Sequence, residues 1–391
     1  MAATPRVART INDRLALDLL LDRGPLTAAQ LREHTGLSQP SVGDLVERLS
    51  AAGLITVVGE AGERRRGPNA RLYGIVADRA HVAGIDARRD SVTMAIADLT
   101  GDVVATLPLP MDRAGEPATV MADAVAAAVE HAGIAPDTLH TVVIGTPGLV
   151  DPISGDVNLV TTLPAWRPSL ASELRERLGR PVVLENEVNL AAIAEHRLGV
   201  ARGRDDFALL WLDRAVGGAV VLGGELRRGA SGGAGEFGYF PVTGPDGEPR
   251  TFHDSVNAEE VAELARAHGQ PVPRTENQDG VPECGLPAGL VASVADVAAA
   301  VRSGGDAFLD ALAARVAVGV LGLCALLDPG FVVLAGDLGR AGGDALAGRV
   351  ADRVASAIPL RTEVRATTVD GNPVLRGALL TALADTRDAL F

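Results

Sequence analysis

The residues with the most recognisable chemistry lie in the first eighty positions. Arg64, Arg65 and Arg66 precede Gly67 and Pro68, between two short apolar runs. Guanidinium groups on a tip stiffened in this way can enter the minor groove of DNA, where narrow A·T tracts concentrate negative potential. The chemistry indicated is contact with double-stranded DNA.

A helix predicted to begin after Ser38 adds a second contact surface. Its first turn presents Gln39 and Ser41, whose side chains suit base edges in the major groove. Arg48 and Arg71 are expected to hold phosphates. The alternative is that the helical pair and the charged hairpin are solvent-exposed and serve only protein contacts.

The elements that must position these residues form a winged helix-turn-helix. Thr27 with Gln30 predicts a capping box, and Gly36 predicts a left-handed helix exit. Ser38 caps the next helix and Pro40 fits its first turn. A third helix over about residues 11–22 is expected to pack through its leucines, Leu15, Leu17, Leu19 and Leu20.

Composition narrows the remaining chemistry. All 36 basic residues are Arg, so Walker-type phosphate loops, pyridoxal Schiff bases and Lys general bases are excluded. Cys284 and Cys324 are the only cysteines, which predicts no disulfide framework and a reducing, cytoplasmic compartment. No signal peptide is expected, and the apolar run 316–327 is shorter than the ~18 residues of a membrane span and predicts a buried helix.

Charge divides the chain. Residues 1–80 contain 11 Arg and 9 acidic residues, whereas residues 81–391 contain 25 Arg and 41 acidic residues. Nucleic-acid contact is therefore expected only in the front segment, predicted as a domain over residues 1–78.

The remaining residues, 79–391, predict a two-lobed α/β body. An apolar strand ending near Asp86 is followed by two more strands, and the same layout returns around Asp213, which indicates a duplicated βββαβα unit. The lobes are expected at about 79–190 and 191–372, with a C-terminal helix over 373–391 returning to the first lobe. A ligand is expected in the cleft between them.

Several segments of this body carry a family resemblance. They are GIDARRD, IGTPGLVDPISGDV, VVLENEVNLAAIAEHRLG, GASGGAGEFGYFPV and DPGFVVLAGDLG. In this order they resemble the ROK family, which groups sugar kinases and repressors on an actin-like, sugar-kinase fold. A winged helix ahead of the body is similar to the repressor branch.

Departures from the kinase pattern bear on activity. Where the resemblance implies Gly-Gly-Thr after Asp86, this chain has Ala87-Arg88-Arg89-Asp90, which places side chains in the phosphate path. The kinase general base is an Asp, and Glu187 stands there, with its carboxylate displaced by roughly an ångström. The Cys-rich zinc loop is missing after Tyr239, so no metal site is predicted.

The resemblance also implies a sugar pocket. Asn186 and Glu236 match the family's sugar contacts, while Glu187 and Tyr239 occupy altered positions. Trp166 is expected either beside the cleft or capping the core. The alternative is a vestigial pocket, with a different ligand or none.

These features predict a DNA-binding transcriptional regulator, specifically a repressor of carbohydrate-utilisation genes, with a catalytically inactive body and no cofactor. Its partners are predicted to be a DNA operator and a sugar or sugar-phosphate effector. A homodimer or a dimer of dimers is expected because paired half-sites multiply specificity. The alternative is an active ATP-dependent sugar kinase that carries an additional DNA-binding domain.

Overall fold

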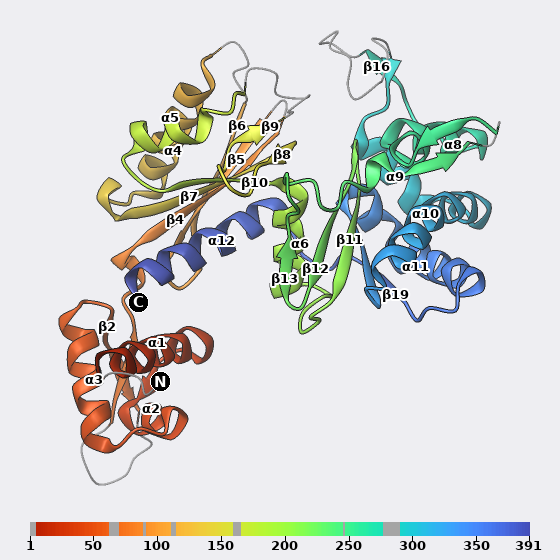
Figure 1. Cartoon of the computed structure of the whole chain (residues 1–391). Helices are drawn as coiled ribbons and strands as arrows, with labels where there is room; N and C mark the ends of the chain where they lie inside the picture. The colour runs from red at the N-terminus through yellow and green to blue at the C-terminus, as the bar shows by residue number, and fades with distance from the viewer. Residues whose placement is uncertain are drawn as a thin grey trace.

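The computed structural model describes residues 5–61, 70–88, 91–110, 115–158, 166–244, 247–276 and 290–391. A small N-terminal domain lies at one end of a body made of two α/β lobes (Figure 1). Each lobe is built around a five-stranded sheet.

The N-terminal domain is a winged helix with a three-stranded sheet in the order β1-β3-β2. Its elements are α1 (Pro5–Arg23), β1 (Leu26–Thr27), α2 (Ala28–Thr35), α3 (Gln39–Ala51), β2 (Ile55–Ala61) and β3 (Ala70–Ile75). A small apolar core joins the three helices to β1 and the start of β2.

The local signals for this domain are confirmed. Thr27 and Gln30 form the capping box of α2, Gly36 ends that helix with φ 69°, and Ser38 caps α3. The prediction for the packing face of α1 was partly wrong. Leu17 and Leu20 are buried, but Leu15 is 40% exposed because Ala16 occupies the inward position beside Leu17.

The first lobe continues from a short linker, η1 (Ala77–Arg79). Its sheet has the order β10-β7-β4-β5-β6. The elements are β4 (His81–Ala87), β5 (Ser91–Asp98), β6 (Val103–Pro110), α4 (Pro117–Ala132), η2 (Pro136–Thr138), β7 (Leu139–Thr146), β8 (Leu149–Val150), β9 (Val157–Asn158), α5 (Leu170–Leu178) and β10 (Val182–Asn186). Helices α4 and α5 cover one face of this sheet.

The second lobe repeats the arrangement with the sheet order β13-β12-β11-β18-β19. The chain enters this lobe through α6 (Glu187–Leu198). The elements that follow, as far as residue 276, are β11 (Phe207–Leu212), β12 (Val216–Leu222), β13 (Glu225–Arg227), η3 (Phe237–Tyr239), β14 (Pro241–Thr243), β15 (Pro249–Thr251), α7 (His253–Val256), α8 (Ala258–Ala267) and β16 (Thr275–Glu276). The rest are β17 (Leu290–Val291), α9 (Val294–Ser303), α10 (Asp306–Leu327), β18 (Phe331–Ala335), α11 (Gly336–Ala357) and β19 (Glu363–Ala366). The last helix, α12 (Pro373–Leu390), lies against β4 and β7 of the first lobe's sheet.

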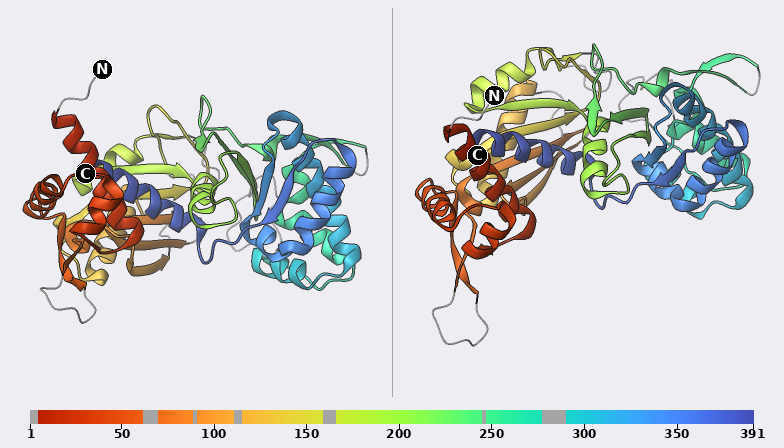
Figure 2. Two further views of the ribbon diagram at one scale, coloured as in Figure 1. Left: turned by 90° about the horizontal axis from the view of Figure 1, so that it is seen from below. Right: turned by 60° about the horizontal axis from the view of Figure 1, so that its bottom comes forward.

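Strand pairing makes the duplication explicit. β4 and β11 are the central strands, and each pairs antiparallel with the next strand and parallel with a later one. Because α6 follows β10 and α12 follows β19, these two helices are equivalents. They pack against each other between the two sheets and share one apolar core with both. Figure 2 shows α12 crossing the first lobe toward the winged helix.

Helix α10 forms the centre of the second lobe's outer core. Val316, Val320, Leu323 and Cys324 are buried, as predicted for this run, although Leu326 is 71% exposed. By length and composition α10 meets the criterion for a membrane span, yet half of its apolar window is buried inside the domain. The core helix of a soluble domain passes the same test.

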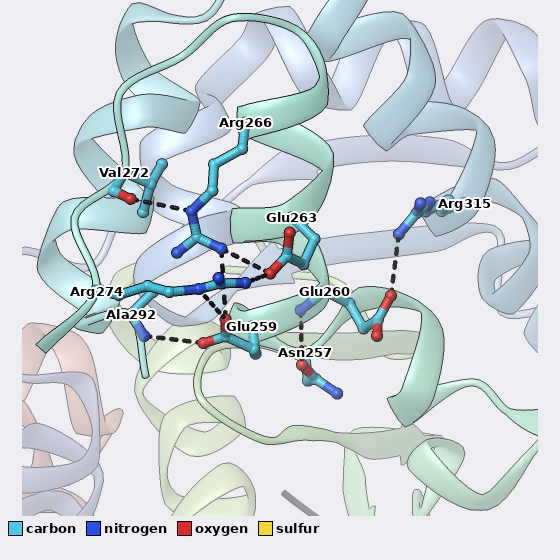
Figure 3. A network of polar contacts seen from close by, with 9 residues as sticks. All are labelled: Asn257, Glu259, Glu260, Glu263, Arg266, Val272, Arg274, Ala292 and Arg315. Atoms are coloured by element: carbon cyan, nitrogen blue, oxygen red, sulfur yellow. Dashed lines mark hydrogen bonds and ion pairs between the residues drawn. The ribbon is translucent and has the colours of Figure 1, made fainter. Parts of the chain in front are cut away.

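A group of charged side chains organises the outer edge of the second lobe (Figure 3). Glu259 accepts a hydrogen bond from the amide of Ala292 at 2.8 Å, and Arg266 donates to the carbonyl of Val272 at 3.0 Å. Arg274 pairs with Glu259 and Glu263. Helix α8 therefore holds the segment that leads into β16 and the residue that follows β17.

Candidate functional site

A cavity of about 380 Å³ lies between the lobes. The turn after β7, the end of β10 and the start of α6 line it on one side, and the β11–β12 turn, η3 and the start of α7 line it on the other. All four effector residues predicted from sequence border it: Asn186, Glu187, Glu236 and Tyr239.

Asn186 serves the fold as well as the cavity. Its Oδ1 accepts the amides of Val188 and Asn189 and so caps α6, while its Nδ2 donates to the carbonyl of Gly148 at 2.8 Å. The side chain therefore fixes the turn that forms one wall of the cavity.

Glu187 follows in the first turn of α6, and the pKa of its carboxyl group is raised. Burial raises its pKa to about 7, repulsion from Asp86 adds to the rise, and attraction to Arg88 opposes it. A carboxyl group in this range exchanges protons near neutral pH. Its environment thus permits either the neutral or the ionised form in the cleft.

Arg88 lies near Glu187 but does not itself line the cavity. Its Nε donates to Asp86 Oδ2 at 2.8 Å. Although burial lowers the pKa of Arg88, attraction to Asp86, Glu187 and Asp213 outweighs that effect and raises it. A permanent positive charge therefore sits among three carboxyl groups, in the turn where the sequence departs from the kinase pattern.

Asp86 is almost completely buried and is tied to a distant part of the chain. The oxygen that accepts from Arg88 also accepts from Asn372 Nδ2 at 2.6 Å. The other oxygen has no hydrogen-bond partner among the described residues. Asn372 was not predicted as a site residue, and its only sequence signal is that of a helix cap before Pro373.

Glu236 and Tyr239 come from the Gly-rich segment of the second lobe. Burial raises the pKa of Glu236. Tyr239 borders the cavity but is 69% exposed, so its ring lies at the rim.

Sequence reasoning missed part of the cavity wall. Asp254 lines it, and two hydrogen bonds from Thr251 lower the pKa of Asp254 although partial burial raises it. His253 also lines it, with Nδ1 3.4 Å from the amide nitrogen of Val216. Trp211 supplies the indole of the wall, whereas Trp166 packs against the first lobe's core.

The winged helix presents a second candidate surface. Gln39 and Ser41 are exposed in the first turn of α3, and Arg71 is exposed on β3. Arg48 bonds to Asp13 of α1 at 2.5 Å, so it also joins α3 to α1. Arg64, Arg65, Arg66, Arg89, Asp90 and Cys284 lie outside the described residues.

The described residues contain no group of three or more His, Cys, Asp or Glu side chains suited to a metal ion. Within them, the segment that replaces the family's Cys-rich loop is held instead by aromatic packing. Phe252 is fully buried against Gly319, and Phe240 packs on Gly322 of the same helix.

The chain joins a winged helix to a duplicated, two-lobed α/β body with a cavity between the lobes. This combination defines its class: a body with a sugar-kinase-like fold behind a winged-helix domain. Comparison with family models agrees: residues 82–260 match the ROK family, and residues 10–66 match the MarR family. Residues 82–260 of the body are therefore similar to the ROK family, and the winged helix ahead of them is similar to the MarR family.

The chain resembles both a repressor and a sugar kinase. The xylose repressor of Bacillus subtilis is 26% identical over 238 residues, which cover 60% of this chain and 61% of the repressor. The glucokinase of Streptomyces coelicolor is 26% identical over 268 residues, 66% of this chain and 82% of the enzyme.

A likeness in fold extends over nearly the whole chain. The crystal structure of a ROK family transcriptional regulator, described as a homologue of the Escherichia coli Mlc protein, superposes with a TM-score of 0.70. It covers 97% of this chain and 98% of that regulator at 18% identity, so the likeness concerns the fold.

Proposed function

We propose that the chain is a cytoplasmic DNA-binding transcriptional regulator, a repressor of carbohydrate-utilisation genes, whose body binds a sugar without phosphorylating it. The observation that carries the proposal is a helix-turn-helix with an exposed α3 N-terminus, attached to a body whose phosphate-path turn contains Arg88 bonded to Asp86. The repressor and regulator among the similar proteins support the same function.

On DNA, α3 would enter the major groove with Gln39 and Ser41 toward base edges. Arg71 and Arg48 would contact phosphates, and Arg64, Arg65 and Arg66 would reach the minor groove. A homodimer would place two such helices on neighbouring half-sites. Asp44 and Glu47 are exposed on α3, and their repulsion of phosphate supports docking through the helix N-terminus rather than along its length.

The cavity favours a neutral sugar over a sugar phosphate. Glu187, Glu236 and Asp254 supply three carboxyl groups to its lining, whereas the described residues that line it include no Arg. Carboxyl and amide groups satisfy sugar hydroxyls stripped of water, but they repel a phosphate. We therefore propose Asn186, Glu187, Glu236 and Tyr239 as effector contacts, with Asp254 as a fifth.

Genomic footprinting with the full chain tests the proposal. Bound sites are expected beside carbohydrate-utilisation genes, and a neutral sugar is expected to change affinity for those duplexes. Changing Arg64, Arg65 and Arg66 together to Ala should lower affinity and reduce the salt slope by about three counterions. Arg302→Ala, on the exposed surface of α9, is the matched control. A chain with no preferred sites would refute the proposal.

An active sugar kinase remains the second candidate because one observation favours it. Glu187 borders the cavity with a pKa of about 7, which suits a general base. Saturable, Mg²⁺-dependent ADP release with any hexose or pentose would support this candidate. We expect no such turnover, since phosphoryl transfer depends on positioning around phosphate oxygens and Arg88 occupies that path.

A further inference from the structure

Helix α12 begins beside Asp86, at the end of β4. Asn372 caps the helix through Oδ1, which accepts the amide of Leu375 at 3.0 Å, and its Nδ2 donates to Asp86. Asp86 accepts from Arg88 at the same oxygen. A ligand that draws Arg88 away therefore changes the bond made by the first turn of α12.

The middle of α12 is tightly packed. The helix has 18 residues and is about 27 Å long. It lies against β4, β7 and α6. A Cβ at Gly377 would overlap the carbonyl group of Leu190, so the two helices have little freedom to slide independently.

The other end of α12 lies at the junction with the winged helix. Arg387 donates from Nη2 to the carbonyls of Leu99 and Thr100 at 2.9 and 3.1 Å. The amide of Leu99 donates in turn to the carbonyl of Ala77 in the linker η1, at 3.0 Å. One turn of α12 therefore holds the linker between the two domains.

The same end of α12 also contacts α1 directly. Asp388 pairs with Arg14 at 2.7 Å, and Phe391 packs against the core of the winged helix. Arg14 also lies 5.7 Å from the centre of the Phe391 ring. An exposed ion pair and one aromatic ring form a weak joint, which small displacements of α12 can alter.

We propose that α12 couples the interlobe cleft to the winged helix, with Asn372 as the positioning residue at the cleft and Asp388 with Phe391 as the positioning residues at α1. A ligand shifts a conformational equilibrium only through contacts that differ between the two states. The proposal assigns this role to the bond between Asp86 and Asn372. The inference rests on the proposed function because it supplies the route by which a sugar would reach the DNA-binding surface.

Hydrogen–deuterium exchange of the full chain tests the coupling without an operator or a sugar. In Asn372→Ser the hydroxyl still caps the helix but is too short to bond to Asp86. We expect α1 amides, residues 7–23, to exchange at least threefold faster than in the wild type. Arg376→Ala, on the exposed face one turn further along α12, should leave them unchanged. Peptides from α8 and α10 report global unfolding.

Exchanging the charges of Arg14 and Asp388 tests the contact between α12 and α1. Asp388→Arg and Arg14→Asp should each accelerate exchange in α1. The double variant should exchange more slowly than Arg14→Asp alone, although the pair of Arg14 with Asp18 is lost in both. In the Asp388→Arg background, Asn372→Ser should have little further effect on α1. Unchanged α1 exchange in Asn372→Ser, or an equal acceleration in both backgrounds, would overturn the coupling. Because no DNA is used, failure here is distinguishable from failure of the proposed function.

Discussion

Asp86 and Asp213 occupy equivalent places in the two lobes, at the ends of the central strands β4 and β11, but they are held differently. Asp213 accepts two backbone amides, those of Arg214 at 2.6 Å and Asp337 at 3.2 Å. Asp86 accepts two side chains, Arg88 and Asn372. A backbone donor is fixed by the fold, whereas a side-chain donor can rotate away. The duplication thus pairs a rigid turn with one that a ligand can rearrange.

The largest effect on stability is expected for Asp213, in the rigid turn. Asp213→Ala leaves two amides without their acceptor, so we expect a loss of about 2 kcal/mol in the free energy of unfolding. Asp213→Asn keeps one acceptor oxygen and should lose less. Urea unfolding of both variants measures the difference. Equal stability of Asp213→Ala and the wild type would remove the distinction between the turns.

Arg88→Ala should destabilise the protein by about 1 kcal/mol at pH 8, with allowance for the partial exposure of its side chain. The variant leaves Asp86, Glu187 and Asp213 without their common cation, and the pKa of Glu187 should rise further. The loss should therefore be smaller at pH 5, where Glu187 is protonated. Arg88→Lys keeps the charge and serves as the control. A loss independent of pH would contradict this electrostatic role.

Glu187→Gln should gain about 1 kcal/mol relative to the wild type as the pH rises from 5 to 8, after allowance for solvent screening. The folded pKa of about 7 lies above that of the unfolded chain. The wild type therefore loses stability as the pH rises through this window, and its stability levels off above pH 7. Thermal unfolding across the pH range checks the sign, and parallel curves would contradict it.

The smallest effect is expected for Asp86→Asn. The amide oxygen can still accept from one of the two donors, and removing the charge relieves a buried carboxylate. We expect a change of about 0.5 kcal/mol in stability but a clear acceleration of exchange in α1. A variant that changes neither quantity would place Asp86 outside the coupling.

Sequence predicted most accurately what is local. The capping box of α2, the exit at Gly36 and the cap of α3 each depend on residues a few positions apart. Leu15 was misplaced because helical periodicity alone does not decide which side of a leucine-rich stripe faces the core. Asn186, Glu187 and Glu236, which short motifs in their own segments singled out, all border the cavity, and their role as effector contacts stays a prediction.

The rest of the site depends on long-range contact. Asn372 lies 286 positions from Asp86, and only the duplicated fold brings them together. Asp254 and His253 enter the cavity because the loop that replaces the family's Cys-rich segment is anchored by Phe252 on α10. No spacing pattern encodes such neighbours, so they became visible only in three dimensions.

The position of α12 in the chain has a consequence for biosynthesis. The five strands of the first sheet are all made by Asn186, yet the helix that covers their inner face begins at Pro373, 187 residues later. At ~5–20 residues per second, the ribosome needs roughly 10–40 seconds for that interval. During this time the apolar face that includes Val82 and Val143 has only α6 to shield it. The nascent first lobe is therefore a natural client for chaperones, which the winged helix, with its own local core, does not require.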